Sequence, residues 1–405
     1  MALDLEKIYI DLHRHPELSF QEHRTASIVA GYLQELGFEV YTGVGQTGVV
    51  GVLAQGPGPV VMLRADMDGL PVAEETGLPY ASIATAHDTA GKEVPVMHAC
   101  GHDMHMTALL GACEQLAATI DEWSGTLIAV FQPAEEGGGG AQVMIDEGLY
   151  DIVPAPDVVL GQHVSPIPAG TFALHPGVTM ASSDSIDITL FGVGGHGARP
   201  ETTVDPVMMA ASLAIRLQQI VSREIGINEQ AVVTIGQIHA GTKNNIIPDR
   251  ATLGVSVRAF NASVRTRVIG AIERIANAEA EAAGAPRPPE ILYRSSYPLT
   301  VNNVEASERT VRALAQEFGE QQVSDYGAAS GSEDVGVLAD SVGAPLVYWF
   351  FGGADPKDFV GAVFSQSVPT DMPSNHSPFY APVIQPTITA GVTALVVAAR
   401  EWLGQ

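Results

Sequence analysis

The first 180 residues alternate short apolar runs with longer segments of helical spacing. Residues 5–36 have helical spacing that is interrupted at Pro16 and ends at Gly37. Strands that alternate with helices predict a mostly parallel sheet with helices on both faces. The apolar runs of strand length cover residues 49–54, 60–65, 127–131 and 158–161, and the helical segments between them cover 106–118 and 141–147.

A different pattern begins near residue 181 and predicts a second domain. Strand-like alternation and helical spacing follow in the order strand, helix, strand, strand, helix, which is typical of a compact antiparallel α+β module. These segments cover residues 185–191, 206–221, 231–238, 251–260 and 264–283. The proline-rich run 285–289 marks a boundary. After it, the sequence predicts helices over 305–318 and 386–403 and a buried strand over 346–351.

These patterns together predict an interrupted catalytic domain. Residues 1–181 and 295–405 would form the α/β catalytic domain, with a mostly parallel sheet and helices on both faces. Residues 182–294 would form the inserted α+β domain. In open α/β sheets, ligands bind at the carboxyl ends of the strands, so this edge of the first domain is where we expect the chemistry.

The charge composition excludes several classes of function. The chain has 46 Asp and Glu residues against 20 Lys and Arg residues, a net charge of -26 at pH 7. Binding to phosphate backbones or anionic membranes requires a basic surface, so neither nucleic acid nor membrane is an expected partner. The longest apolar stretch, 388–399, is shorter than the ~20 residues that a membrane span needs. Two cysteines and an acidic N-terminal segment favour a cytoplasmic protein.

Two short segments combine residue types that commonly bind metal ions. Cys100 and His102 lie two positions apart, and an extended chain that bends at Gly101 would let both side chains reach one ion. Glu135 and Glu136 are neighbours. On an extended chain they point in opposite directions, so one could bind metal while the other faces a bound water. Each segment alone is also compatible with structural or surface residues.

Two further histidines enlarge this set. His163 follows the apolar run 158–161, and His376 lies near the far end of the chain. Because the carboxyl ends of parallel strands meet at one edge of a sheet, these histidines and the two segments above could share one cleft. Five nitrogen, oxygen and sulfur ligands are too many for one tetrahedral site and enough for a pair of metal ions.

Seven sequence blocks occur in an order that is far more specific than any one motif. They are LRADMDGLP (63–71), CGHD (100–103), PAEEGGGG (133–140), GHGA (195–198), NIIP (245–248), GSED (331–334) and NHS (375–377). In these blocks the chain resembles the M20 metallopeptidase family, above all its amidohydrolase branch of N-acyl-amino-acid, hippurate and auxin-conjugate hydrolases. The resemblance starts at residues 13–18 and covers nearly the whole chain. Met104 departs from it, since many relatives have glycine there.

The resemblance implies a site for two divalent metal ions. The implied ligands are Cys100, His102, Glu136, His163 and His376. Glu135 would be the general base, and Asp68 would orient a ligand imidazole. The inserted domain would act as a lid. In this family the same domain often forms the contact between subunits, so the resemblance implies a homodimer or higher homo-oligomer. His196 would stabilise the oxyanion, and Asn245 and Arg258 would hold a substrate carboxylate. Zinc is the metal we expect first, while manganese, cobalt and nickel also suit these ligands.

The expected reaction is hydrolysis of the amide bond of an N-acyl amino acid. Metal ions would polarise the carbonyl and activate a water, and Glu135 would pass its proton to the leaving amine. A carboxypeptidase or dipeptidase that acts on short peptides is the nearest alternative. A non-catalytic metal-binding protein is the alternative from another class, and the intact Glu135 argues against it.

A third alternative is an NAD-dependent oxidoreductase. Residues 192–197 match the glycine spacing of a dinucleotide site, but no acidic residue follows about twenty positions later, where a contact with the ribose requires one. This alternative is therefore weak.

Other histidines and the second cysteine have simpler interpretations. His13 and His15 precede a proline in the first helical region, where we expect them to make structural hydrogen bonds. His98 and His105 flank the candidate metal site. Cys113 lies in an apolar helical segment and is predicted to be a small core residue.

Overall fold

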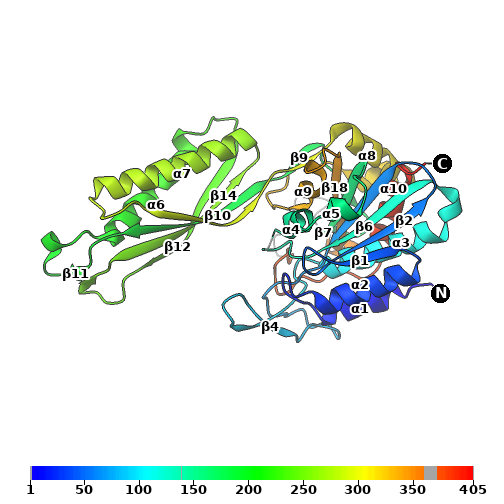
Figure 1. The fold of residues 1–405 in the computed structure, drawn as a ribbon, viewed down its shortest axis with the longest axis horizontal. Coiled ribbons are helices and arrows are strands. Elements are labelled where there is room, and N and C mark those ends of the chain that lie inside the picture. The colour runs from blue at the N-terminus through cyan, green and yellow to red at the C-terminus, as the bar shows by residue number, and fades with distance from the viewer. Residues whose placement is uncertain (1, 138, 360–371, 405) are drawn as a thin grey trace. The chain divides into compact units, whose positions relative to one another are not determined.

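The chain folds into two compact units, which Figure 1 shows coloured by residue number. The structure is a computed structural model and describes residues 2–137, 139–359 and 372–404. The first unit comprises Met1–Thr179, Val301–Gly327 and Asp334–Gln405, and the second comprises Met180–Thr300 and Ala328–Glu333. The second unit extends beyond residue 294, where the sequence analysis places the boundary, because strand β15 (Glu290–Tyr297) pairs with β10 (Ser182–Phe191).

An eight-stranded, mostly parallel sheet forms the centre of the first unit. In spatial order its strands are β1 (Glu39–Val44), β2 (Gly48–Gln55), β6 (Gly125–Gln132), β3 (Val60–Asp66), β7 (Val158–Pro168), β18 (Leu346–Ala354), β8 (Phe172–Ala173) and β17 (Val323–Ser324). Strands β6, β3, β7 and β18 run parallel, so their carboxyl ends lie along one edge. The predicted fold class is confirmed for this unit.

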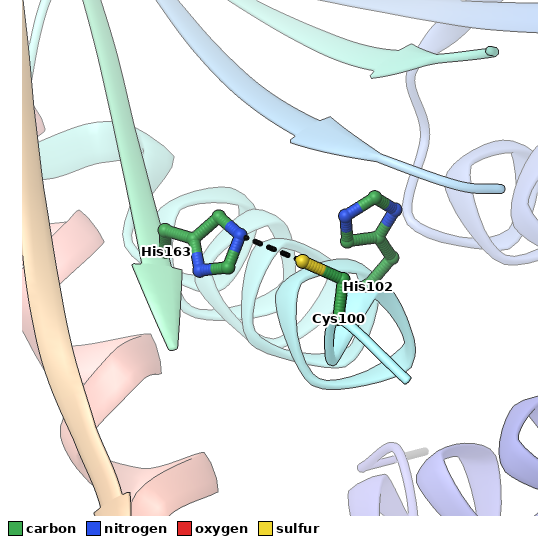
Figure 2. A group of neighbouring side chains, drawn as sticks. All are labelled: Cys100, His102 and His163. Carbon is green, nitrogen blue, oxygen red and sulfur yellow. Dashed lines mark hydrogen bonds between the residues drawn. The ribbon is translucent and has the colours of Figure 1, made fainter. Parts of the chain in front are cut away.

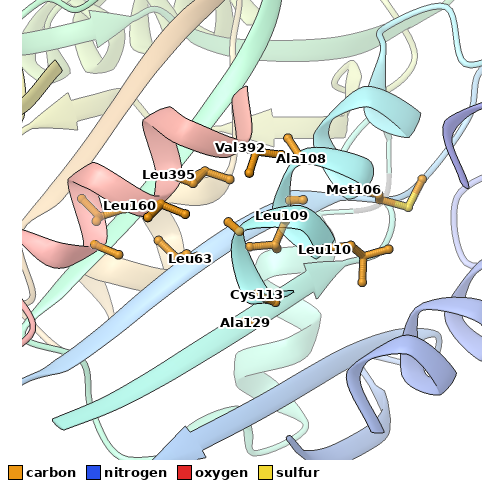
Figure 3. Close-up of a cluster of buried hydrophobic side chains, with 14 of the residues drawn as sticks. Leu63, Met106, Ala108, Leu109, Leu110, Cys113, Ala129, Leu160, Val392 and Leu395 are labelled. Carbon is orange, nitrogen blue, oxygen red and sulfur yellow. The ribbon is translucent and has the colours of Figure 1, made fainter. Parts of the chain in front are cut away.

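Helices cover the sheet of the first unit. Helices α3 (His102–Ala118) and α10 (Thr387–Arg400) pack against one face, where Leu63 and Leu160 lie (Figure 3). Met62 on β3 points to the opposite face and is also buried, and short helices contact β6 and β7. The other helices are α1 (Leu5–Arg14), α2 (His23–Glu35), α4 (Gly140–Asp146), α5 (Leu149–Ile152), α8 (Val304–Phe318) and α9 (Val335–Asp340). None of the helices in the described ranges is long and apolar enough to cross a membrane.

A four-stranded antiparallel sheet forms the second unit, together with two helices that lie on one face of it (Figure 1). Its strand order is β12 (Ala231–Ala240), β14 (Arg250–Ala259), β10 and β15, and its helices are α6 (Pro206–Arg223) and α7 (Ala262–Ala282). Every second residue of β14 is buried, as its alternating pattern predicts. The short strands β11 (Gly195–His196) and β13 (Ile246–Ile247) form a separate pair.

Candidate active site

The N-terminus of α3 presents Cys100 and His102, whose side chains are buried. Gly101 between them has a left-handed backbone with φ +85°, and a Cβ atom there would lie 2.4 Å from Val164 Cγ1. Glycine is therefore required for this turn. The helix begins at His102, four residues before the predicted start, so the expectation of an extended chain from Cys100 to His102 is wrong. The preceding strand β5 (Glu93–Pro95) also lies outside the main sheet.

His163 on β7 faces the thiol of Cys100, as Figure 2 shows. Its Nε2 lies 3.3 Å from Cys100 Sγ, while its Nδ1 donates to the Val164 carbonyl at 2.7 Å. Burial and the neighbouring His105 hold the pKa of His163 well below its usual range. Burial, followed by the charge of Glu136, holds the pKa of the Cys100 thiol well above its usual range. A neutral imidazole thus offers the lone pair of Nε2 towards the sulfur, as a metal ligand would.

Glu135 and Glu136 lie in a turn after β6, not on the extended chain that the sequence analysis expects. Ala134 before them has a left-handed backbone with φ +49°. The N–H groups of Glu135 and Glu136 donate to the two carboxylate oxygens of Asp68, at 3.1 and 3.0 Å. Both glutamates and His102 offer ligand atoms that lie within 4.8 Å of one another. Gly138, which belongs to the PAEEGGGG block of the sequence, lies outside the described residues.

His376 reaches the same place from a loop near the end of the chain. Its N–H donates to the Ala99 carbonyl at 2.8 Å, and its Nε2 lies 3.1 Å from Glu136 Oε1. The neighbouring Asn375 donates from Nδ2 to the Cys100 carbonyl at 3.1 Å. These contacts hold the loop against the turn before α3. The sequence alone indicates no role for Asn375, although this residue stands inside the NHS block.

His102 lies among three carboxylates. Its Nδ1 is 3.3 Å from Asp68 Oδ1 and 3.7 Å from Asp66 Oδ1, and its Nε2 is 3.8 Å from Glu136 Oε1. Burial disfavours the imidazolium, but Asp66, Asp68 and Glu136 outweigh it and raise the pKa of His102 to about 10. This arrangement attracts positive charge, whether as a proton or as a metal ion.

Asp66 connects the site to a buried charge network that the sequence analysis missed. Asp66 Oδ1 lies 2.6 Å from His105 Nδ1, and Nε2 of the same imidazole accepts from the Val164 N–H at 2.8 Å. Arg64, which is 1% exposed, donates to Asp66 Oδ2 at 2.7 Å and to Gln132 Oε1 at 2.8 Å. His105 therefore supports the peptide beside His163. Arg64 and Asp66 stand inside the LRADMDGLP block, which was the available signal.

The donor set fits metal ions. His102 Nε2 is buried and has no hydrogen-bond partner among the described residues. Two triads bring their ligand atoms within 4.8 Å of one another: Cys100 with His102 and His163, and Cys100 with Glu136 and His376. All five residues that the sequence analysis expects as ligands are thus brought together. Nitrogen, sulfur and carboxylate donors are the combination that zinc and its neighbours accept.

The second unit carries His196, Asn245 and Arg258, and these do not form one cluster there. The N–H of Gly197 donates to the Asn245 carbonyl at 2.9 Å, which brings the first two residues close together beside the start of β14. Arg258 lies near the other end of β14, where its Nη1 donates to the Ser330 carbonyl at 2.7 Å. Residues 250 and 258 are eight positions apart on one strand, a distance of about 26 Å.

Cys113, His13 and His15, for which the sequence predicts structural positions, are buried or hydrogen-bonded within the first unit. Cys113 is fully buried in the core (Figure 3). His13 and His15 make hydrogen bonds inside the first unit. Met104 is also fully buried in the core. Burial lowers the pKa of His98 to about 4, and neither ring nitrogen has a hydrogen-bond partner among the described residues.

Comparisons with known proteins find similarity over most of the chain. The model of peptidase family M20/M25/M40 matches residues 62–362. A hippurate hydrolase from Campylobacter jejuni is 42% identical over 342 residues, which cover 83% of this chain and 85% of that protein. Thermostable carboxypeptidase 1 from Saccharolobus solfataricus is 38% identical over 352 residues, 85% of each chain. The crystal structure of the Bacillus subtilis YXEP protein, described as a dinuclear metal binding peptidase from the M20 family, has a TM-score of 0.75 at 28% identity, covering 98% of this chain and 96% of that one.

Proposed function

Since the chain belongs to the amidohydrolase branch of peptidase family M20/M25/M40 and is a hydrolase of amide bonds, we propose that it cleaves N-acylated amino acids into a carboxylic acid and a free amino acid. The observation that carries the proposal is the carboxylate pair after β6. Glu136 Oε1 lies 3.1 Å from His376 Nε2. Both glutamates also place a carboxylate oxygen within 4.8 Å of a ring nitrogen of His102. The similarity to the hippurate hydrolase supports an acylated amino acid as substrate.

The five clustered donors would hold two divalent metal ions, zinc first, with manganese, cobalt or nickel as alternatives. They are Cys100, His102, Glu136, His163 and His376. When bound, such ions polarise an amide carbonyl and make a bound water more acidic. The likeness to the dinuclear YXEP structure supports two ions rather than one.

Glu135 would act as the general base. It takes a proton from the attacking water and returns it to the amide nitrogen, which otherwise leaves poorly as an anion. Asp68 would fix the geometry, because its two oxygens accept from the N–H groups of Glu135 and Glu136, and Oδ1 also lies 3.3 Å from His102 Nδ1. One carboxylate thus orients the base and a candidate ligand together.

The second unit would supply a lid and a dimer contact. In this proposal His196 donates to the oxyanion, and Asn245 and Arg258 bind the substrate carboxylate. Residues 250 and 258 are about 26 Å apart along β14, and Asn245 precedes the first of them. Contact of both Asn245 and Arg258 with one small substrate would therefore require two copies of the chain. Strand β12 supports a homodimer, since within the described ranges it pairs only with β14. Ile215 and Ile238, which are 68% and 51% exposed, line an apolar groove beside this edge.

A carboxypeptidase that acts on short peptides is the second candidate, and the 38% identity to thermostable carboxypeptidase 1 favours it. Parallel assays on metal-reconstituted protein, with N-acetyl amino acids, N-benzoyl amino acids and dipeptides, would separate the two. Faster release of amino acid from the acylated substrates supports our proposal. Preference for dipeptides supports the carboxypeptidase, and inactivity on all three would favour a non-catalytic metal-binding protein.

Glu135→Gln is the direct test of the mechanism. The amide cannot accept the proton, so we expect kcat to fall about 10²- to 10⁴-fold while two metal ions remain bound. Glu136→Gln is the matched control, because it alters the neighbouring carboxylate and should weaken metal binding instead. Full activity of Glu135→Gln with its metal content unchanged would refute the role of Glu135 as base.

A further inference from the structure

Glu22 is a buried carboxyl that the proposed reaction does not use. It directly precedes α2, and its side chain is fully buried. Oε1 accepts from the N–H of Ala134 at 2.9 Å, and Oε2 accepts from Thr47 Oγ1 at 2.6 Å. A residue of the N-terminal segment therefore contacts the turn after β6, 112 positions further along the chain.

That turn is held through three consecutive backbone N–H groups. Ala134 donates to Glu22, while Glu135 and Glu136 donate to the two oxygens of Asp68. Successive N–H groups at a left-handed position form a concave site for anions, and here two side-chain carboxyls of the protein occupy it. Asp68 anchors the end of the turn, and Glu22 anchors its start.

Ala134 is the position where such an anchor is needed. Its φ of +49° lies in the left-handed region, which residues other than glycine rarely adopt. Its carbonyl accepts from the N–H of Gly140 at 3.1 Å, so both polar groups of this residue are bonded. A change in its backbone would redirect the two glutamates that follow it.

We propose that Glu22 is a positioning residue, which holds the N–H of Ala134 and thereby fixes the directions of the Glu135 and Glu136 carboxylates. The inference rests on the proposed function, in which Glu135 moves the proton and Glu136 binds metal. Glu22 acts through the turn, because its two described partners are Thr47 and Ala134.

The position requires a hydrogen-bond acceptor rather than a charge. Burial and the nearby Asp68 raise the pKa of Glu22 to about 7. The neutral carboxyl still offers Oε1 to Ala134 and can donate from Oε2 to Thr47. A glutamine side chain offers the same pair of groups, so it should replace Glu22, whereas a methionine of similar length should not.

Glu22→Gln and Glu22→Met form the matched pair for the test. For Glu22→Met we expect kcat to fall about 100-fold with little change in KM, since a small misplacement of the base slows the reaction by that factor. Its affinity for Zn²⁺, measured by chelator competition on metal-free protein, should fall about tenfold or more. Glu22→Gln should stay within about threefold of the wild type in both measurements. Thr47→Val, which removes the other partner of Glu22, should resemble Glu22→Gln.

Hydrogen–deuterium exchange of the metal-free protein tests the contact without any substrate. The peptide that contains Ala134 should exchange faster in Glu22→Met than in the wild type, Glu22→Gln or Thr47→Val. If the wild type cleaves no acylated amino acid, the proposed function fails, while exchange and Zn²⁺ affinity still decide the role of Glu22. Unchanged exchange and affinity in Glu22→Met, or equal damage in Glu22→Gln, would overturn the inference.

Ala134→Gly supplies the remaining control. Glycine adopts the left-handed conformation without support, so adding Ala134→Gly to Glu22→Met should restore part of the lost kcat and Zn²⁺ affinity. The same double variant decides the case in which Glu22→Met does not fold. Recovery of folding by Ala134→Gly supports the positioning role, and failure to recover contradicts it.

Discussion

His13→Gln tests how the first unit stabilises buried charge next to the candidate active site. The His13 side chain, on α1, is 1% exposed. Its Nδ1 lies 2.7 Å from Asp103 Oδ2 and its Nε2 lies 3.0 Å from Glu74 Oε1. Burial disfavours the protonated ring, but the two carboxylates outweigh it and raise the pKa of His13 to about 9. An imidazolium therefore bridges two buried carboxylates at neutral pH, and Asp103 directly follows the candidate ligand His102.

The size of the effect follows from the shift in pKa. The pKa of His13 rises from 6.5 to about 9 on folding, so its contribution to stability is complete below about pH 6.5 and is lost as the pH rises through 9. Linkage gives about 3 kcal/mol at pH 6.5, about 1.5 kcal/mol at pH 8 and close to zero at about pH 10. We expect His13→Gln to be destabilised by about 3 kcal/mol near neutral pH, the lower end of the cost of breaking a buried ion pair.

Urea unfolding, followed by tryptophan fluorescence, would measure the free energy of unfolding of the wild type and of His13→Gln. Trp123, Trp349 and Trp402 are the three tryptophans of the chain, and all belong to the first unit, so the signal reports that unit alone. The protein should be metal-free, because bound ions add their own stability. His15→Gln is the matched control, since the His15 side chain is 49% exposed. It should leave the unfolding free energy nearly unchanged.

The dependence of this free energy on pH decides whether the imidazolium of His13 supplies the stability. The difference in unfolding free energy between wild type and His13→Gln should shrink between about pH 6.5 and about pH 9.5. A difference that is equally large at both pH values would show that the imidazolium does not supply the stability. Absence of any difference near neutral pH would refute the reasoning altogether.

Three further predictions concern metal binding, the stability of the first unit and the capture of substrate. Cys100→Ala should lower metal affinity at least about tenfold, whereas Cys113→Ala, in the core, should leave the metal content of dialysed protein unchanged. Gly101→Ala should destabilise the first unit by about 1–3 kcal/mol in the same unfolding assay, because its φ is positive and the new Cβ meets Val164; a neutral effect would contradict this. Raising the salt concentration from about 0.05 M to about 0.5 M should maintain or improve kcat/KM, because salt screens the repulsion between a substrate carboxylate and the net charge of -26. A steep loss of kcat/KM with salt would contradict this repulsion, because it would mean that salt screens a net attraction instead.

The central strands could be predicted because burial on both faces leaves a continuous apolar run. Strand β3, for example, is predicted over 60–65 and spans Val60–Asp66. Strands β1 and β15 were missed, since both lie at sheet edges and nearly all of their residues are exposed or only partly buried. The edge position of β15, directly after a proline-rich run, also explains why the expected boundary at residue 294 differs from the observed one.

The candidate site was predicted in its residue types but not in its backbone. Cys100, His102 and His163 were recognisable because metal-binding side chains are distinctive. The turn at Ala134 was not, because a left-handed alanine has no signature in the sequence. Glu22 and Asp66 were missed for another reason: their roles depend on partners far along the chain or on other strands, which spacing alone cannot reveal.

The loop of Asn375 and His376 determines the stage of synthesis at which the candidate site becomes complete. The turn before α3 receives its contacts from this loop only after the inserted unit and β18 have been synthesised, since the chain leaves the ribosome from its N-terminus. A nascent chain that already holds Cys100, His102, Glu136 and His163 still lacks one candidate ligand. If His376 is a ligand, hydrolytic activity is expected to begin only when the final segment has docked.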